Sequence, residues 1–142
     1  MMYLDSSLVV SAITRETDTQ AVLSWLERQS ADDLFISEWV VTEVMSALAL
    51  KVRSGLIDND TRSKAKGGFR AMRDQGLHMF EIGDAHFRHA TVLINSCPVK
   101  LRAADSLHLA IADRNGASVC TLDIEMLGAA KALRIPALSP LQ

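Results

Sequence analysis

Four acidic residues of this chain of 142 residues are placed where their carboxylates could act together. Asp5 directly follows the apolar run Met1–Leu4, and Asp123 directly follows Ser118–Leu122. Both runs have the length and composition of strands, and the ligands of open α/β sheets bind beyond the carboxyl ends of the strands. An aspartate at such a place can also cap the helix that follows, so each position taken alone leaves both roles open.

The other two acids lie within segments that have a helical period. Glu43 has Trp39 and Ala47 one turn away on either side, and burial of its carboxylate on that face would be costly unless it is paired or binds a metal. Asp105 shares its face with Leu109, which directs it toward a core. The simpler alternatives are an exposed edge position for Glu43 and a favourable interaction with the helix dipole for Asp105.

Four carboxylates directed at one edge of a sheet would repel one another, and the sequence shows no matching set of inward lysines or arginines. A divalent cation would remove this repulsion, and a ligand set made only of oxygens suits Mg²⁺ or Mn²⁺. Such an ion lowers the pKa of a bound water and neutralises charge as a phosphodiester is hydrolysed. The residues therefore predict a metal-assisted hydrolase whose ligands are Asp5, Glu43, Asp105 and Asp123.

The elements that must position these acids alternate between short apolar runs and longer segments of helical period. Strands are expected at Met1–Leu4, Leu34–Ile36, His78–Ile82, Ser118–Leu122 and Pro136–Leu138. Helices are expected at Leu8–Ile13, from a cap at Ser37 to Ser54, from Asp58 or Asn59 to before Gly76, from Asp84 to before Pro98, from Arg102 to Asn115, and at Glu125–Arg134. This rhythm predicts an α/β fold in one domain, residues 1–142, with a mostly parallel sheet of about five strands flanked by helices.

The composition limits the classes of protein that need to be considered. Apolar residues make up 49% of the chain and charged residues 23%, a balance that favours a packed core over disorder. No apolar run is long enough to span a bilayer, and Asp5 interrupts the start of the chain before a signal-peptide core could form, so a cytoplasmic protein without membrane contact is expected. Cys97 and Cys120 fit two reduced thiols better than a disulfide.

The charge is distributed unevenly along the chain. The formal net charge is −2, but the segment from Lys51 to Arg73 carries +5 and the remainder carries −7. This asymmetry predicts an anionic partner that approaches one face, and a solvated helix face explains it equally well. If such a partner reaches the acids along this segment, its helix should pass near the edge of the sheet where the acids gather.

Taken together, these segments resemble the PIN domain and, within it, the small toxin ribonucleases of VapBC-type toxin–antitoxin pairs. The resemblance covers essentially the whole chain, and the order and spacing of its four pieces carry it. The most distinctive piece is Ala103-Ala104-Asp105 followed by Leu107-His108-Leu109-Ala110. The others are Met2-Tyr3-Leu4-Asp5-Ser6-Ser7, Val41-Thr42-Glu43-Val44 and Thr121-Leu122-Asp123.

The resemblance implies an Mg²⁺-dependent endoribonuclease that forms a homodimer and binds an antitoxin protein which occupies the active site. It implies that the four acids bind the metal and catalyse cleavage of RNA, with Thr121 as a supporting partner. Glu125 is not placed in the site, although many relatives have an arginine or another acid just after the position of Asp123. Apolar helices near Ala12 and Trp25 and at Val40–Leu50 offer the surface on which a dimer is expected.

Other classes of protein fit the sequence less well. A haloacid-dehalogenase-type phosphatase needs a second acid at position 7, which is Ser7, and a receiver domain needs paired acids near its first strand. His86 and His89 have helical spacing but lack a third zinc ligand nearby, and His108 fits a structural hydrogen bond better than a catalytic role. A non-catalytic PIN-like module that binds RNA or protein remains the alternative function.

Overall fold

Five parallel strands form a single sheet in the computed structural model, which describes all 142 residues. The order across the sheet is β3-β2-β1-β4-β5, so the first strand lies in the middle. Within the sheet, Met2 of β1 pairs with Leu34 of β2 on one side and with Ser118 of β4 on the other. The strands are β1 (Met2–Leu4), β2 (Leu34–Ser37), β3 (His78–Phe80), β4 (Ser118–Cys120) and β5 (Ala137–Leu138).

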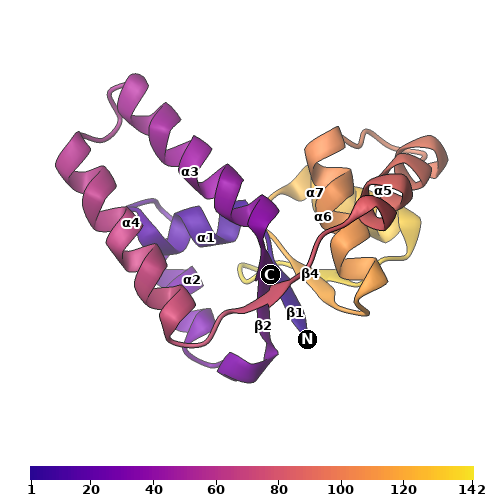
Figure 1. Cartoon of the computed structure of the whole chain (residues 1–142), viewed down its shortest axis with the longest axis horizontal. Coiled ribbons are helices and arrows are strands. Elements are labelled where there is room, and N and C mark those ends of the chain that lie inside the picture. Colours follow the sequence, from indigo (N-terminus) through magenta and orange to yellow (C-terminus); the bar gives the residue numbers. More distant parts are fainter.

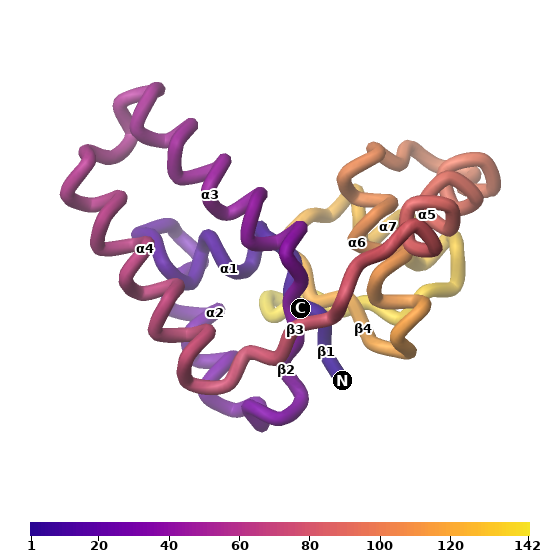
Figure 2. The backbone as a smooth tube through the Cα atoms, viewed as in Figure 1, coloured from indigo at the N-terminus to yellow at the C-terminus, as the bar shows by residue number.

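Helices cover both faces of this sheet. Figure 1 shows α1 to α4 on one side of the strands and α5 to α7 on the other, and Figure 2 follows the backbone between the two groups. The first group is α1 (Ser6–Ile13), α2 (Thr19–Leu26), α3 (Glu38–Arg53) and α4 (Asn59–Asp74), with a short 3₁₀ turn at Ala31–Asp33. The second is α5 (Asp84–Ser96), α6 (Ala103–Arg114) and α7 (Ile124–Leu133).

The strand order explains why the helices divide in this way. The chain moves outward from β1 to β2 and β3, returns to β4 beside β1, and then continues to β5 in the opposite direction. Because crossovers between parallel strands are right-handed, the two directions place their helices on opposite faces. The reversal lies between β1 and β4, and this switch point is where open α/β sheets bind ligands, beyond the carboxyl ends of the strands.

The core lies on both sides of the central strands. Tyr3 and Leu4 of β1 are fully buried on its two faces, as are Ile36 of β2 and Val119 of β4. Leu109 of α6 is also fully buried. Strands covered on both faces read as continuous apolar runs, which is why the sequence showed short apolar segments instead of alternation.

The predicted fold class is confirmed: the domain is α/β, with five parallel strands flanked by helices. Asp58 caps α4 as expected, with its carboxylate accepting from the backbone N–H of Thr61 at 2.7 Å. Ser37 and Ser54 stand at the two ends of α3 as predicted, although the side chain of Ser37 makes no capping bond. Its hydroxyl lies 2.8 Å from the hydroxyl of Tyr3 instead.

The apolar surface is not where the sequence placed it. Within the predicted surface Val40–Leu50, Val40, Val44 and Leu48 are fully buried because α3 packs against α1, α4 and the sheet, although Leu50 stays exposed. A larger group of exposed apolar side chains lies on α5, at Phe87, Val92 and Ile94. No helix is both long enough and apolar enough to cross a membrane.

Candidate active site

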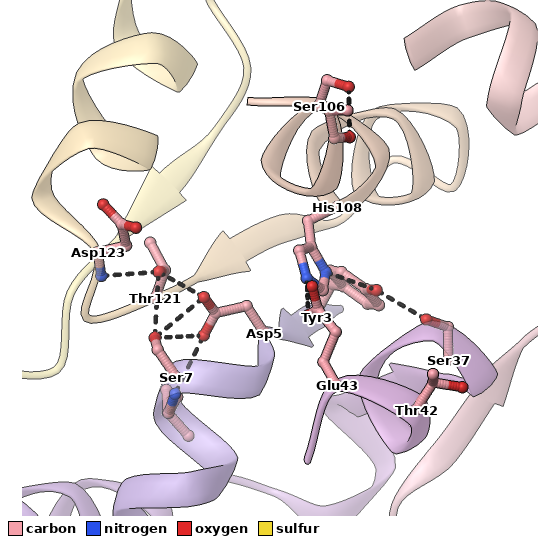
Figure 3. Close-up of polar contacts among 12 residues, drawn as sticks. Tyr3, Asp5, Ser7, Ser37, Thr42, Glu43, Ser106, His108, Thr121 and Asp123 are labelled. Atoms are coloured by element: carbon pink, nitrogen blue, oxygen red, sulfur yellow. Dashed lines mark hydrogen bonds and ion pairs between the residues drawn. The ribbon is translucent and has the colours of Figure 1, made fainter. Parts of the chain in front are cut away.

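The carboxyl edge of the sheet brings the predicted acids together. Asp5 follows β1 and Asp123 stands two residues beyond Thr121, after β4, so both come from strands that flank the switch point. Glu43 reaches this edge from the second turn of α3, and Asp105 reaches it from the first turn of α6. Figure 3 shows Asp5 between Asp123 on one side and Glu43 on the other.

Asp5 is the buried centre of this group, with only 2% of its surface exposed. Its carboxylate accepts hydrogen bonds from the hydroxyl of Thr121 at 2.7 Å, from Ser7 at 2.8 and 3.0 Å, and from the backbone N–H of Leu8 at 3.1 Å. The last bond caps α1, so the capping role and a place in the site are combined. Burial raises the pKa of Asp5 even though His108 and these donors favour its charged form.

Thr121 and Ser7 link Asp5 to Asp123. The Thr121 hydroxyl donates to Asp5 and accepts the backbone N–H of Asp123 at 2.9 Å, while Ser7 accepts the backbone N–H of Leu122 at 3.0 Å. These bonds fix the loop after β4 against the end of β1, and the dashed lines in Figure 3 mark those that Thr121 makes with Asp5 and Asp123. This contact agrees with the supporting role that the resemblance implied for Thr121.

Glu43 is held by a histidine from the opposite helical layer. Its Oε2 accepts from Nε2 of His108 at 2.6 Å, and the other ring nitrogen, Nδ1, lies 3.1 Å from the hydroxyl of Tyr3. That hydroxyl in turn lies 2.8 Å from Ser37, so the chain of polar contacts runs from Glu43 to the end of β2 (Figure 3). Burial alone would raise the pKa of Glu43, but the hydrogen bond and charge of His108 outweigh it and the pKa is lowered.

Asp105 and Asp123 form the open half of the site. Burial raises the pKa of Asp105, and the charges of Asp123 and Glu43 raise it further, while His108 and Arg102 act in the opposite direction. The carboxylate of Asp123 accepts two backbone bonds at the start of α7, from Glu125 at 2.7 Å and Met126 at 3.1 Å. No side chain from a distant part of the sequence donates a hydrogen bond to Asp105 or to Asp123.

Glu125 is engaged outside the group of acids, and the site prediction did not include it. One of its oxygens lies 2.9 Å from Nζ of Lys100 and the other lies 3.2 Å from the guanidinium of Arg102. The hydrogen bond from Lys100 is the main reason why the pKa of Glu125 is lowered. Its carboxylate is thus already neutralised by two cations.

The basic segment does not run beside the acids in the way the sequence predicted. Lys66, Arg70 and Arg73 of α4 line a groove together with Val41 and Met45 of α3. Val41 and Met45 each stand two residues from Glu43, which is about 200° around a helix, so they project from the opposite flank of α3. Helix α3 therefore separates this groove from the acids.

The donor set suits a divalent metal ion, although the acids do not form a finished cage. No three of the histidine, cysteine, aspartate and glutamate side chains come together in a group that could hold a metal ion. Mg²⁺ commonly takes only one or two carboxylates and completes its shell with waters and substrate phosphate, so such a group is not required. His86 and His89 are bonded to the Gly83 N–H and to Asp113 instead.

The sequence did not indicate that Tyr3 and Ser7 contact the site. For His108 it favoured a structural hydrogen bond, and the structure shows that this bond is made to Glu43. Tyr3 could have been recognised because it stands two residues before Asp5, so both side chains leave the strand on the same face. Ser7 stands two residues after Asp5, where a hydroxyl can bond to a carboxylate locally. The contact of His108 with Glu43 joins residues far apart in the chain and has no local signal.

The family model of the PIN domain matches residues 2–132, a range that contains all four acids. The chain belongs to the PIN-domain family. It is 32% identical to a protein of Mycobacterium tuberculosis named Ribonuclease VapC46, over 98% of this chain and 97% of that protein. Among solved structures, FitAcB from Neisseria gonorrhoeae has a TM-score of 0.74 at 18% identity and covers 100% of this chain and 99% of its own.

Further PIN-domain structures share the fold at low identity. VapC20 of Mycobacterium tuberculosis, described as a toxin that cleaves the sarcin-ricin loop, has a TM-score of 0.71 at 13% identity, covering 91% of this chain and 95% of its own. VapBC2 from Rickettsia felis, solved with a DNA fragment from its promoter, also has a TM-score of 0.71 at 13% identity, with 98% of each chain covered. These PIN-domain structures establish the arrangement of strands and helices.

Proposed function

We propose that this PIN-domain protein is an Mg²⁺-dependent endoribonuclease and the toxin of a VapBC-type toxin–antitoxin pair. Asp5, Glu43, Asp105 and Asp123 are its catalytic and metal-binding residues, and Mn²⁺ can replace Mg²⁺. The name of the relative, Ribonuclease VapC46, supports the reaction and the toxin class. RNA as substrate and an antitoxin as partner place its action in the cytoplasm.

The observation that carries this proposal is the convergence of acids on one edge of the sheet: Figure 3 shows those that follow β1 and β4 and the one from α3, and the charges of Asp123 and Glu43 act on Asp105 of α6. Burial and neighbouring acids raise the pKa of Asp105, although the charge of Arg102 opposes this rise, and the raised pKa is the electrostatic cost of gathering negative charge at this edge. His108 offsets part of that charge, by its hydrogen bond to Glu43 and by its charge near Asp5 and Asp105. A divalent cation would offset the rest.

The chain's own residues supply positioning and charge. Thr121 and Ser7 orient the carboxylate of Asp5, and His108 orients that of Glu43. Asp105 and Asp123 are partly exposed and accept no hydrogen bond from another side chain, so their oxygens would be open to a metal ion. The bound metal would lower the pKa of the attacking water and neutralise charge on the scissile phosphate.

Cleavage in the presence and absence of metal tests the reaction. We expect cutting of single-stranded or structured RNA with Mg²⁺ or Mn²⁺, no cutting with EDTA, and recovery when excess metal is added back. Full activity in the chelator would refute the metal mechanism. Binding of RNA without any cutting in either metal would favour the alternative, a non-catalytic module that binds RNA or protein.

The partners are part of the same proposal. The structural neighbours include VapBC assemblies, which supports an antitoxin partner for this chain. Phe87 and Ile94, exposed on one face of α5, line an apolar groove with Trp39 and support a homodimer, because a monomer seldom leaves such a patch in water. Light scattering at micromolar concentration should give twice the mass of the chain, and a monomer would count against the dimer.

A further inference from the structure

Two cations lie beside the open half of the acid group. Arg102 is the cap residue of α6, three residues before Asp105, and its charge acts on the Asp105 carboxyl. Lys100 stands two residues earlier. Both side chains are more than half exposed, at 62% for Lys100 and 60% for Arg102.

Glu125 holds both cations at the rim of the site. Its two oxygens pair separately with Lys100 at 2.9 Å and with Arg102 at 3.2 Å. Glu125 belongs to the first turn of α7, two residues after Asp123. The ion pairs therefore join the start of α6, which carries Asp105, to the start of α7, which Asp123 caps.

Stability is a weak explanation for this arrangement. Exposed ion pairs contribute little to the stability of a fold, because water screens them and long side chains lose freedom when they are held. The position of the pair points to a ligand, since two exposed cations stand beside Asp105 at the mouth of the carboxylate group that a substrate phosphate has to approach. Arg102 also keeps guanidinium N–H groups beyond the one that contacts Glu125, and a planar guanidinium matches phosphate oxygens well.

We propose that Lys100 and Arg102 bind a phosphate of the RNA backbone next to the one being cleaved. The inference rests on the proposed ribonuclease function and adds a substrate-binding site to it. The pair would draw the polyanion toward a group of carboxylates that otherwise repels it. Glu125 keeps the two side chains extended over the rim between Asp105 and Asp123, so the phosphate meets cations that are already in place.

The chain contains a matched control for this proposal. Lys66 and Arg70 of α4 are also one lysine and one arginine at the surface, but they line the groove on the far flank of α3. Their removal changes the net charge of the protein by the same amount. A difference between the two double variants therefore reports position and not total charge.

The experiment compares Lys100→Ala/Arg102→Ala with Lys66→Ala/Arg70→Ala. Binding of a fluorescein-labelled pool of random single-stranded RNA is measured by anisotropy over a range of KCl, with Asp5→Asn added to every protein to stop cleavage. Steady-state cleavage is measured separately with Asp5 intact. Circular dichroism checks that the variants keep the fold, as expected for exposed side chains.

We expect the Lys100/Arg102 variant to bind RNA about tenfold more weakly and to raise KM by a similar factor. Its log–log salt slope should fall by roughly 0.7 for each phosphate of the single strand that the variant no longer binds. The turnover number should stay within about threefold of the parent, since neither side chain is proposed to touch the reacting atoms. The α4 variant should change affinity by less than about twofold.

An unchanged affinity and salt slope in the Lys100/Arg102 variant would overturn the inference, and so would an equal loss of affinity in both double variants. These outcomes leave the proposed ribonuclease intact as long as the parent protein cuts RNA. Conversely, a parent that binds RNA through this pair but never cuts it would refute the nuclease and keep the phosphate site. The two proposals therefore fail in different ways.

Discussion

The two halves of the acid group are held in different ways. Asp5 and Glu43 receive hydrogen bonds from side chains far away in the sequence, Thr121 for the first and His108 for the second. Asp105 and Asp123 sit at the starts of α6 and α7, where their surroundings are mainly the helix ends and each other. One half is fixed by tertiary contacts and the other by local helix geometry.

This difference shows how a small domain can collect negative charge without unfolding. In the enclosed half, each carboxylate is paired with donors, so burial does not leave an unsatisfied polar group. In the open half, Asp105 stays only partly buried and water can screen its repulsion with Asp123. We infer that the enclosed half sets the geometry of the site and that the open half admits metal and substrate.

The largest expected effect comes from removing charge from either half. Asp5→Asn and Asp105→Asn should each lower the turnover number by at least about a hundredfold, a loss typical of removing one group that stabilises the transition state. The measurement is single-turnover cleavage of RNA in saturating Mg²⁺. Either variant cutting at the parental rate would remove that residue from the site.

The free energy of unfolding should distinguish the two halves of the acid group more clearly than the cleavage rate does. His108→Ala removes a buried ring and leaves Glu43 and Tyr3 each with one partner fewer, so it should destabilise the fold by about 2 to 4 kcal/mol. Urea unfolding followed by circular dichroism measures the loss. His89→Ala is the matched control, because His89 also bonds to a carboxylate, Asp113, at 2.7 Å but is partly exposed.

We expect the His89 variant to lose less than about 1 kcal/mol, as exposed ion pairs do. Similar losses in the two histidine variants would mean that the enclosed half is no better ordered than a surface contact. That result would contradict the distinction drawn between the halves.

The sequence predicted the open half more fully than the enclosed one, for a physical reason. Asp123 and Asp105 occupy helix starts, which short-range patterns reveal, and Asp5 follows a strand that its apolar run reveals. The bond between His108 and Glu43 depends on how α6 and α3 meet across the sheet edge. No local pattern encodes that meeting.

The same reason explains where the structure departs from the sequence. Ser37 precedes α3 as its residue type predicted, but its hydroxyl contacts Tyr3 of the neighbouring strand instead of capping the helix. The basic segment had the charge expected of an RNA-binding face, but the direction of α4 places Lys66 and Arg70 behind α3. In both cases the residue types were recognised correctly and their tertiary neighbours were not.

A smaller effect is expected where one hydroxyl is removed from the enclosed half. Tyr3→Phe keeps the buried ring but leaves Nδ1 of His108 and the Ser37 hydroxyl with one partner fewer, which should cost about 1 kcal/mol. Urea unfolding again gives the value. A variant as unstable as His108→Ala would show that the ring of Tyr3, and not the polar chain, is what the substitution disturbs.

The smallest expected effect is the pH dependence that belongs to Asp105. Its pKa is raised above the ordinary value of 3.8 by burial and by Asp123, so the folded protein binds this proton more tightly than the unfolded chain does. Stability linked to Asp105 is therefore lost as pH rises from that ordinary value through the raised pKa, and it stays constant at higher pH.

The Asp105→Asn variant has no such proton to lose. In EDTA, its thermal midpoint should equal that of the parent at low pH and match or exceed it near neutral pH, where the parent carries the repelling charges. Repeating the comparison in Mg²⁺ should shrink the difference between the two thermal midpoints near neutral pH. The parent can bind the cation through Asp105 and so loses its repulsion, whereas the variant has little repulsion to lose. A midpoint for Asp105→Asn that falls below the parent as pH rises in EDTA would mean that the ionised carboxylate stabilises the fold, and the open half would then be no site of stored repulsion.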